Sequence, residues 1–139
     1  MIYALHEALA LVIDEGIENR VQRHIRHGAA LQAGLEAMGL VLHAQKGHRL
    51  STLTSVRIPE GIEDAKFRQK LLNEYSIEIG GGLGPLKGKI WRIGLMGHSS
   101  TQHNIILVLS AMEKLLQSDG FNVDEGAGVS AALKLLSKK

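Results

Sequence analysis

Apolar side chains recur at steps of three and four through the first forty residues, with charged residues largely between them. This is the period of an amphipathic helix, so the pattern predicts one long helix over residues 1–39 or two helices joined end to end. Gly16, Gly28 and Gly34 weaken such a helix but need not break it. Gly39 suits the position just after its last turn. The apolar positions are Ile2, Leu5, Leu9, Val12, Ile13, Ile17, Val21, Ile25, Leu31, Leu35 and Met38.

Short alternating segments follow and predict β-strands. Residues 53–58 alternate in polarity and are ended by Pro59 and Gly61. In the segment 89–95, Arg92 shares one face with Ile90 and Gly94, while Trp91 lies on the opposite face and is assigned to the core. The predicted strands cover residues 40–43, 53–58, 76–79 and 89–95.

Helical periodicity returns in three places. Glu63 or Asp64 can cap a helix that runs to about Tyr75. One of the hydroxyl residues 99–101 can cap a long helix with Gly120 as its stop, and residues 129–136 form a short amphipathic tail helix that packs on the domain or its neighbour. The order α–β–β–α–β–β–α predicts an α+β fold. We expect a mainly antiparallel sheet of three or four strands with helices on one face, preceded by the long N-terminal helix.

Composition narrows the class of protein. The chain of 139 residues suffices for one hydrophobic core, so we expect a single domain. A net charge of +2, with the charges scattered, argues against nucleic acid or an anionic membrane as the main partner. No apolar run reaches the roughly 18 residues of a membrane span. With no cysteine there is neither a disulfide nor a thiolate nucleophile, which fits a cytoplasmic protein.

The glycine-rich loop GGGLGPLKG, residues 80–88, invites comparison with nucleotide-binding loops. A dinucleotide fingerprint requires G-x-G-x-x-G between a strand and a helix, but Gly82, Gly84 and Gly88 miss this spacing by one residue and precede a strand. A P-loop requires G-x-x-x-x-G-K-[ST], and Leu83 and Ile90 occupy two of its fixed positions. Both alternatives fail, and a hairpin connection fits the loop by itself.

Arg92, in the strand that follows this loop, is a charged residue among apolar ones. An arginine in the middle of a short apolar strand must be paired with an acidic side chain or must face a cleft that supplies an anion. The residues alone leave two alternatives open, a structural ion pair and a site that binds a carboxylate.

Other polar clusters predict no site. The pair His24 and His27 and the pair His98 and His103 lack convergent carboxylates or thiolates, so we expect solvent-facing or cap-region histidines and no metal. Four charged residues near the start are expected to form a solvated helix face: Glu15, Glu18, Arg20 and Arg23.

Three segments together resemble a known family. Residues 77–105, IEIGGGLGPLKGKIWRIGLMGHSSTQHNI, are similar to the C-terminal domain of the class V, fold-type I pyridoxal-phosphate aminotransferases of the alanine–glyoxylate and serine–pyruvate group. Residues 1–24, MIYALHEALALVIDEGIENRVQRH, resemble the interdomain helix of that family, and residues 56–79 fit between the two in the same order. The resemblance covers residues 1–120 and divides the domain into an interdomain helix (1–39), an α+β core (40–120) and a tail (121–139).

The resemblance implies a role for Arg92. In the family, the arginine of the RIG strand after the glycine loop pairs with the α-carboxylate of the substrate, and Arg92 stands at that position. Gly80, Gly81 and Gly82 would border the substrate entrance. The implied reaction moves an amino group from alanine or serine to glyoxylate or pyruvate in a homodimeric enzyme.

The resemblance also implies a missing part. The Schiff-base lysine, the aspartate that pairs the pyridine nitrogen and the phosphate-binding groups of the family lie in a large domain that would precede Met1. Lys87 and Lys89 do not match the cofactor-lysine motif, so we expect no cofactor-binding or catalytic residue in this chain. Because the apolar pattern starts at Ile2 without a capping residue, we expect a chain cut from a longer one.

Two hypotheses follow. The chain is one part of a pyridoxal-phosphate aminotransferase, or it is an inactive stand-alone domain or gene fragment that acts, if at all, as an interaction module. In either case an apolar face without its large domain predicts self-association.

Overall fold

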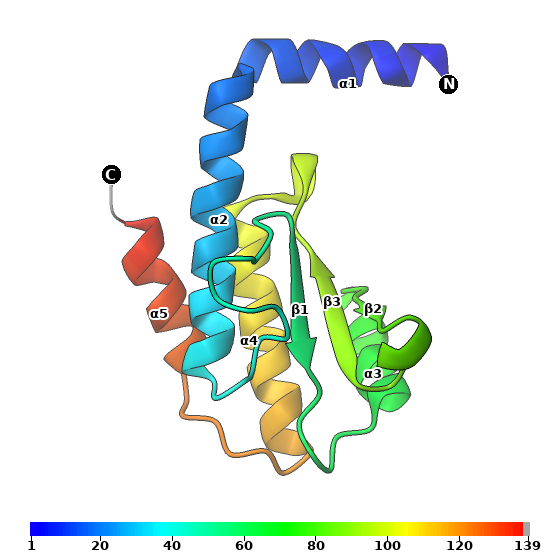
Figure 1. Ribbon diagram of the computed structural model, residues 1–139, viewed down its shortest axis with the longest axis vertical. Coiled ribbons are helices and arrows are strands. Elements are labelled where there is room, and N and C mark those ends of the chain that lie inside the picture. Colours follow the sequence, from blue (N-terminus) through cyan, green and yellow to red (C-terminus); the bar gives the residue numbers. More distant parts are fainter. Residues whose placement is uncertain (138–139) are drawn as a thin grey trace.

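The computed structural model describes residues 1–137, which form five α-helices, three strands and two short 3₁₀ turns. The predicted tail ends at Lys138 and Lys139, which lie outside the described residues. The strands pair antiparallel in the order β1-β3-β2, with helices packed against one face, so the expected α+β fold is confirmed (Figure 1). The elements are α1 (Ile2–Glu15), α2 (Ile17–Ala37), β1 (Leu53–Arg57), α3 (Asp64–Tyr75), β2 (Gly80–Gly81), η1 (Gly84–Leu86), β3 (Ile90–Gly94), η2 (Gly97–Ser99), α4 (Gln102–Ser118) and α5 (Ala127–Leu136).

Gly16 divides the predicted N-terminal helix into α1 and α2. Its φ of 79° is unfavourable for a residue with a side chain, and its N–H closes α1 by bonding to the carbonyl oxygens of Val12 and Ile13. The carbonyl of Gly16 accepts the N–H of Arg20 at 3.0 Å and so starts α2. Two helices joined end to end are therefore confirmed. The helix α1 turns away from the rest of the domain and has no buried residue (Figure 1).

An ion-pair cluster holds the bend between α1 and α2. The carboxylate of Glu15 accepts hydrogen bonds from Arg20 Nη1 at 2.8 Å and from Nε and Nη2 of Arg23. The hydrogen bond from Arg23 is the main reason that the pKa of Glu15 is lowered to about 2. Arg23 Nη1 also donates to the carbonyl oxygens of Gly97 at 3.1 Å and Ser100 at 2.7 Å. The prediction of a solvated helix face is wrong for Glu15, Arg20 and Arg23, because the bend brings them together.

His24 and His27 continue the same side of α2 and are 8% and 6% exposed, so the prediction that they face solvent is wrong. His24 Nδ1 donates to the carbonyl of Arg20 at 2.7 Å, and its Nε2 accepts the N–H of Gly97 at 2.9 Å. His27 Nδ1 donates to the carbonyl of Ser100 at 2.9 Å. Because a carbonyl only accepts, both rings carry their proton on Nδ1. Burial lowers the pKa of His27 below 6.5, although the bond to Ser100 opposes this.

The helices cover one face of the sheet. Val56, Trp91 and Ile93 are buried on that face, and the ring of Trp91 stacks on Phe67 of α3 with 4.3 Å between centroids. The assignment of Trp91 to the core is confirmed. Arg92, between Trp91 and Ile93, points to the opposite face, as the alternation of a strand requires.

The predicted strand 40–43 is confirmed only in part. Leu42 forms an antiparallel bridge to Val56, and the N–H groups of His43 and Arg57 bond to the carbonyl oxygens of Ser55 and Val41 at 2.8 Å, so the segment pairs with β1 over a single bridge. The predicted strand 76–79 is wrong. The segment 76–79 is still leaving α3, because Ser76 has a left-handed φ of 56° and the N–H of Ile77 bonds back to the carbonyl of Leu71 at 3.1 Å. The strand that pairs with β3 on the side away from β1 is instead β2, the glycine pair Gly80–Gly81.

The last two helices agree with the sequence. Thr101 caps α4 by accepting the N–H of Asn104 at 3.2 Å, and Gly120, with φ of 87°, follows its end. The helix α5 confirms the predicted tail helix and packs on α2 where two glycines meet. A Cβ on Gly34 would lie 2.9 Å from the carbonyl oxygen of Gly128, so this close crossing depends on the absence of a side chain.

Substitution of His27 by glutamine should reduce the loss of stability in mild acid. The unfolded imidazole titrates near 6.5 and the folded one at lower pH, so the unfolded chain binds more protons in this window. The stability contributed by neutral His27 is therefore complete above about pH 6.5 and declines as the pH falls towards the folded pKa.

Urea unfolding at about pH 7.5 and about pH 5.5 measures this decline. His27→Gln should show a smaller difference between the two pH values than the unmodified chain, while the same change at exposed His98 should leave the difference as it was. Equal declines in the His27→Gln variant and the unmodified chain would contradict the assignment.

Candidate functional site

Arg92 lies in the middle of the central strand β3. Its Cα pairs with Ser55 of β1 on one side and with Gly80 of β2 on the other. The side chain is half-buried and lies on the face of the sheet opposite Trp91. The fold therefore places a guanidinium on the less covered face, beside the glycine pair, although the surrounding strand is apolar.

The guanidinium of Arg92 is held against β2. Its Nε donates a hydrogen bond of 2.8 Å to the carbonyl oxygen of Gly81. A Cβ on Gly80 would lie 3.3 Å from Nη2 and 3.6 Å from Cζ and Nε of Arg92, so the plane of the guanidinium covers the Cα of Gly80. None of the five ion pairs among residues 1–137 includes Arg92. In this part of the chain, the structural ion pair that the sequence left open is absent.

A second arginine lies against the same glycine pair. A Cβ on Gly81 would lie 3.4 Å from Nε and Nη2 of Arg68 and 3.5 Å from its Cζ. Arg68 is bound by Asp64, with Nε to Oδ1 at 2.8 Å and Nη2 to Oδ2 at 3.4 Å, and this bond raises the pKa of Arg68 above its usual value. Trp91 Nε1 donates to the same Oδ1 at 3.2 Å.

Gly82 serves the turn that follows. A Cβ there would lie 1.9 Å from the carbonyl oxygen of Leu86, a distance that no rearrangement of a side chain could relieve. The turn η1 closes with bonds from Leu86 N–H to the Leu83 carbonyl at 3.0 Å and from Lys89 N–H to the Leu86 carbonyl at 3.0 Å. Of the three predicted entrance glycines, Gly80 and Gly81 contact arginines, while Gly82 permits the turn. Their role at a substrate entrance stays a prediction.

This arrangement is suited to binding a carboxylate. A guanidinium has five N–H donors in a planar fork, and the bond to Gly81 occupies only Nε. Nη1 and Nη2 have no hydrogen-bond acceptor among residues 1–137 and can bind both oxygens of one carboxylate. A lysine could not bond to Gly81 and bind a carboxylate in this bidentate manner.

The described residues do not fit a pyridoxal-phosphate site. An imine-forming lysine is activated by desolvation, yet every lysine of residues 1–137 except Lys70 is exposed, and Lys70 is paired with Asp119. Within the same range no group of three or more His, Asp or Glu side chains could hold a metal ion, and no helix is long and apolar enough to cross a membrane. The exposed lysines are Lys46, Lys66, Lys87, Lys89, Lys114 and Lys134.

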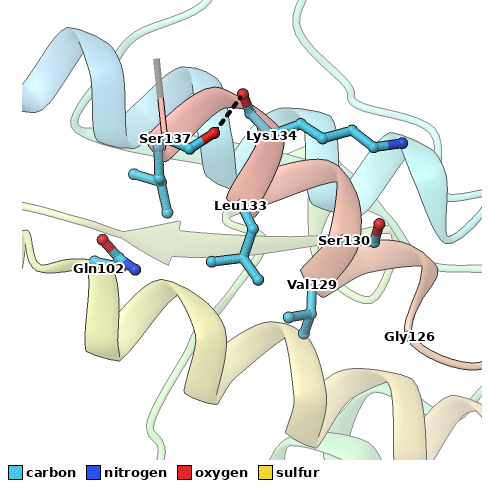
Figure 2. A pocket seen from close by; sticks show the side chains of 8 residues that line it. Gln102, Gly126, Val129, Ser130, Leu133, Lys134 and Ser137 are labelled. Atoms are coloured by element: carbon cyan, nitrogen blue, oxygen red, sulfur yellow. Dashed lines mark hydrogen bonds between the residues drawn. The ribbon is translucent and has the colours of Figure 1, made fainter. Parts of the chain in front are cut away.

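A surface groove between two helices lies away from Arg92. A shallow groove of about 580 Å³ runs between α4 and α5, with Gln102, Val129 and Leu133 among its lining residues (Figure 2). Its lining is mainly apolar, with Lys134 as the one charged side chain. Among residues 1–137, its lining includes no guanidinium bonded to a backbone carbonyl, which is the feature that distinguishes Arg92.

Sequence reasoning missed Arg68 and considered Asp64 only as a helix cap. Their i,i+4 spacing could have indicated an ion pair on α3. That this pair lies against Gly81 depends on how α3 packs on the sheet, and no local pattern carries that information.

Curated proteins similar to this chain are aminotransferases. It is 44% identical to the (S)-ureidoglycine–glyoxylate transaminase of Bacillus subtilis over 133 residues. The matched segment is 96% of this chain and 32% of that protein. It is 48% identical over 139 residues to an uncharacterised aminotransferase of Methanocaldococcus jannaschii, covering all of this chain and 36% of that protein. An alanine–glyoxylate aminotransferase of Callithrix jacchus is 41% identical over 117 residues, which are 84% of this chain and 28% of that protein. The chain thus spans about a third of the curated relatives it matches.

Solved structures give the same result. The crystal structure of ureidoglycine–glyoxylate aminotransferase from Bacillus subtilis superimposes with a TM-score of 0.94 at 42% identity, covering 98% of this chain and 35% of that one. No protein-family model matches the chain. Since sequence and structure agree on the relatives and on the share of them that is covered, the chain corresponds to the C-terminal small domain of the class V aminotransferases.

Proposed function

We propose that this domain supplies the carboxylate-binding side of an aminotransferase active site, with Arg92 pairing with the α-carboxylate of the substrate. The observation that carries the proposal is a half-buried guanidinium whose Nε is anchored to Gly81 and which has no acidic partner among residues 1–137. A half-buried guanidinium without an acidic partner is costly, and an anionic ligand would lower this cost by accepting its free N–H groups.

The relatives support a small 2-oxo acid as one substrate. Two of them are named for ureidoglycine and alanine as different partners of the same acid, glyoxylate. The feature common to an amino acid and a 2-oxo acid is a carboxylate next to the reacting carbon, and a single arginine can bind it in both. We therefore propose transfer of an amino group from a small amino acid such as alanine or serine to glyoxylate or pyruvate.

The cofactor of this reaction would be bound by another part of the protein. Aminotransferases of this class use pyridoxal 5′-phosphate, which supplies the electron sink for amino transfer. The lysines of residues 1–137 do not fit that group, so we assign it to the two-thirds of the relatives that this chain does not match. In the complete enzyme, which we propose to be a cytoplasmic homodimer, Arg92 would hold and orient the substrate.

Grafting tests the role of Arg92. The chain can replace the matching third of the Bacillus subtilis transaminase, to which it is 44% identical. In that graft, Arg92→Ala should lower kcat/KM for the amino acid by at least about 100-fold, because two charge-assisted hydrogen bonds are lost. Arg92→Lys should recover little of this loss.

The control is Lys87→Ala, which removes one exposed positive charge from the same loop without touching Arg92. Its kcat/KM should match that of the unmodified graft. An unchanged KM and kcat in Arg92→Ala would show that the substrate carboxylate is bound elsewhere.

The second candidate function, an interaction module, is favoured by the surface of α1. The helix buries none of its residues, and large apolar side chains are exposed along it: Ile2, Tyr3, Leu5, Leu9, Leu11 and Ile13. Water-exposed apolar surface of this kind marks an interface. We infer that the chain by itself associates through α1.

Light scattering of the purified chain tests this inference. The measured mass should be that of a dimer or larger species. The double substitution Leu5→Glu and Leu9→Glu should reduce it to the mass of a monomer, because charges cannot be buried unpaired in an apolar interface. Glu7→Lys, a charge change at another exposed position of α1, is the control and should leave the mass unchanged. A monomeric unmodified chain at all concentrations would refute association.

A further inference from the structure

Two guanidinium groups cover opposite sides of the glycine pair in β2. Arg92 lies over Gly80, and Arg68 lies against Gly81, each with three guanidinium atoms within 3.6 Å of the place where a Cβ would be. Successive residues of a strand face opposite sides, so the two arginines approach the pair from the two faces of the sheet. The glycine pair thus lies between two planar cations, each close enough to be in direct contact with a Cβ placed on its glycine.

The carbonyl of Gly81 determines which edge of Arg92 is available. Because Nε–H is occupied by this carbonyl at 2.8 Å, the fork left for a carboxylate is the one formed by Nη1 and Nη2. A rotation of the Gly81 peptide would release Nε and turn this fork. The orientation of the guanidinium therefore depends on the orientation of one glycine peptide, and a glycine peptide is intrinsically the least restrained.

Arg68 supplies that restraint. It is held by two bonds to Asp64, and Asp64 is held in turn by Trp91 Nε1, whose ring is fully buried and stacked on Phe67. A series of contacts thus connects buried Trp91 through Asp64 and Arg68 to the side of Gly81 opposite Arg92. We propose that Arg68, anchored by Asp64, is a positioning residue for Arg92: it fixes the Gly81 peptide whose carbonyl orients the substrate-binding fork. This inference rests on the proposed function of Arg92.

The alternative is that Arg68 and Asp64 form an ordinary i,i+4 pair that only stabilises α3, which at a surface contributes little. The two cases differ in one observable. A helix-stabilising pair changes the unfolding midpoint but not the environment of Arg92, whereas a positioning pair changes the hydrogen bond of Arg92 Nε in the folded protein.

Nitrogen-15 NMR of the arginine side chains in the full chain measures this difference. The Nε–Hε signal of Arg92 is assigned by its loss in Arg92→Lys, and its hydrogen exchange should be slow because Hε is bonded to Gly81. Arg68→Met should shift this signal and speed its exchange by about tenfold, as expected for loss of one oriented hydrogen bond. Lys66→Met removes the same charge from an exposed position of the same helix and should leave the signal unchanged.

A more conservative pair of variants guards against misfolding. Arg68→Lys keeps a cation for Asp64 but lacks the flat face, and its effect on exchange should lie between those of the unmodified chain and Arg68→Met. Asp64→Asn should loosen Arg68 and act in the same direction. If the Arg92 signal and its exchange are unchanged in Arg68→Met, Arg68→Lys and Asp64→Asn, the positioning role is overturned.

Titration with pyruvate separates this inference from the proposed function. Pyruvate should perturb the Arg92 signal in the unmodified chain, and its affinity should fall about tenfold in Arg68→Met but not in Lys66→Met. If Arg92→Ala leaves the graft fully active, the carboxylate role fails while the exchange result still decides the positioning role. Equal pyruvate affinity in Arg68→Met and the unmodified chain overturns the inference alone.

Discussion

The attachment of α2 to the backbone of residues 97–100 is the interaction on which the arrangement of the domain depends. Arg23, His24 and His27 bind the carbonyl and amide groups of Gly97 and Ser100, immediately after the central strand ends. These groups belong to a tight turn and have few partners of their own, so leaving them buried and unbonded would be costly. By satisfying them, α2 is fixed across the sheet, and α1 is fixed through Glu15.

The candidate site shows how glycine and arginine can be complementary. Glycine in a strand normally weakens it, because no side chain packs on the neighbouring strand. In β2 the missing side chains leave room for two guanidinium planes, and the carbonyl of Gly81 provides an acceptor that fixes one of them. The glycines thus make the space, and Arg92 supplies the charge. A P-loop uses backbone amides for binding an anion, whereas here a backbone carbonyl orients the guanidinium that we propose as the anion-binding group.

Local patterns predicted what depends on neighbours in the sequence. Three such predictions are confirmed: the periodicity of α2 and α4, a cap among the hydroxyl residues 99–101, which is Thr101, and the alternation that separates Arg92 from Trp91. The errors lie where distant segments meet. His24 and His27 are polar, and the crossing of α2 over residues 97–100 buries them. The contact of Arg68 with Gly81 depends on the packing of α3. Residues 76–79 do not pair because Ser76 ends α3 in a left-handed conformation.

The bend at Gly16 and the attachment of α2 respond to acid over different ranges. Neutral His27 loses its contribution below about pH 6.5, whereas Glu15, with a pKa lowered from 4.5 to about 2, contributes fully above about pH 4.5 and loses its contribution only as the pH falls through 2. Arg23 stays charged throughout this range. On acidification, the buried position of His27 in α2 therefore becomes unfavourable while α1 is still tied to α2 through Glu15. The ion pairs that join α1 to α2 at the bend are thus retained at a pH at which the burial of His27 in α2 already costs stability.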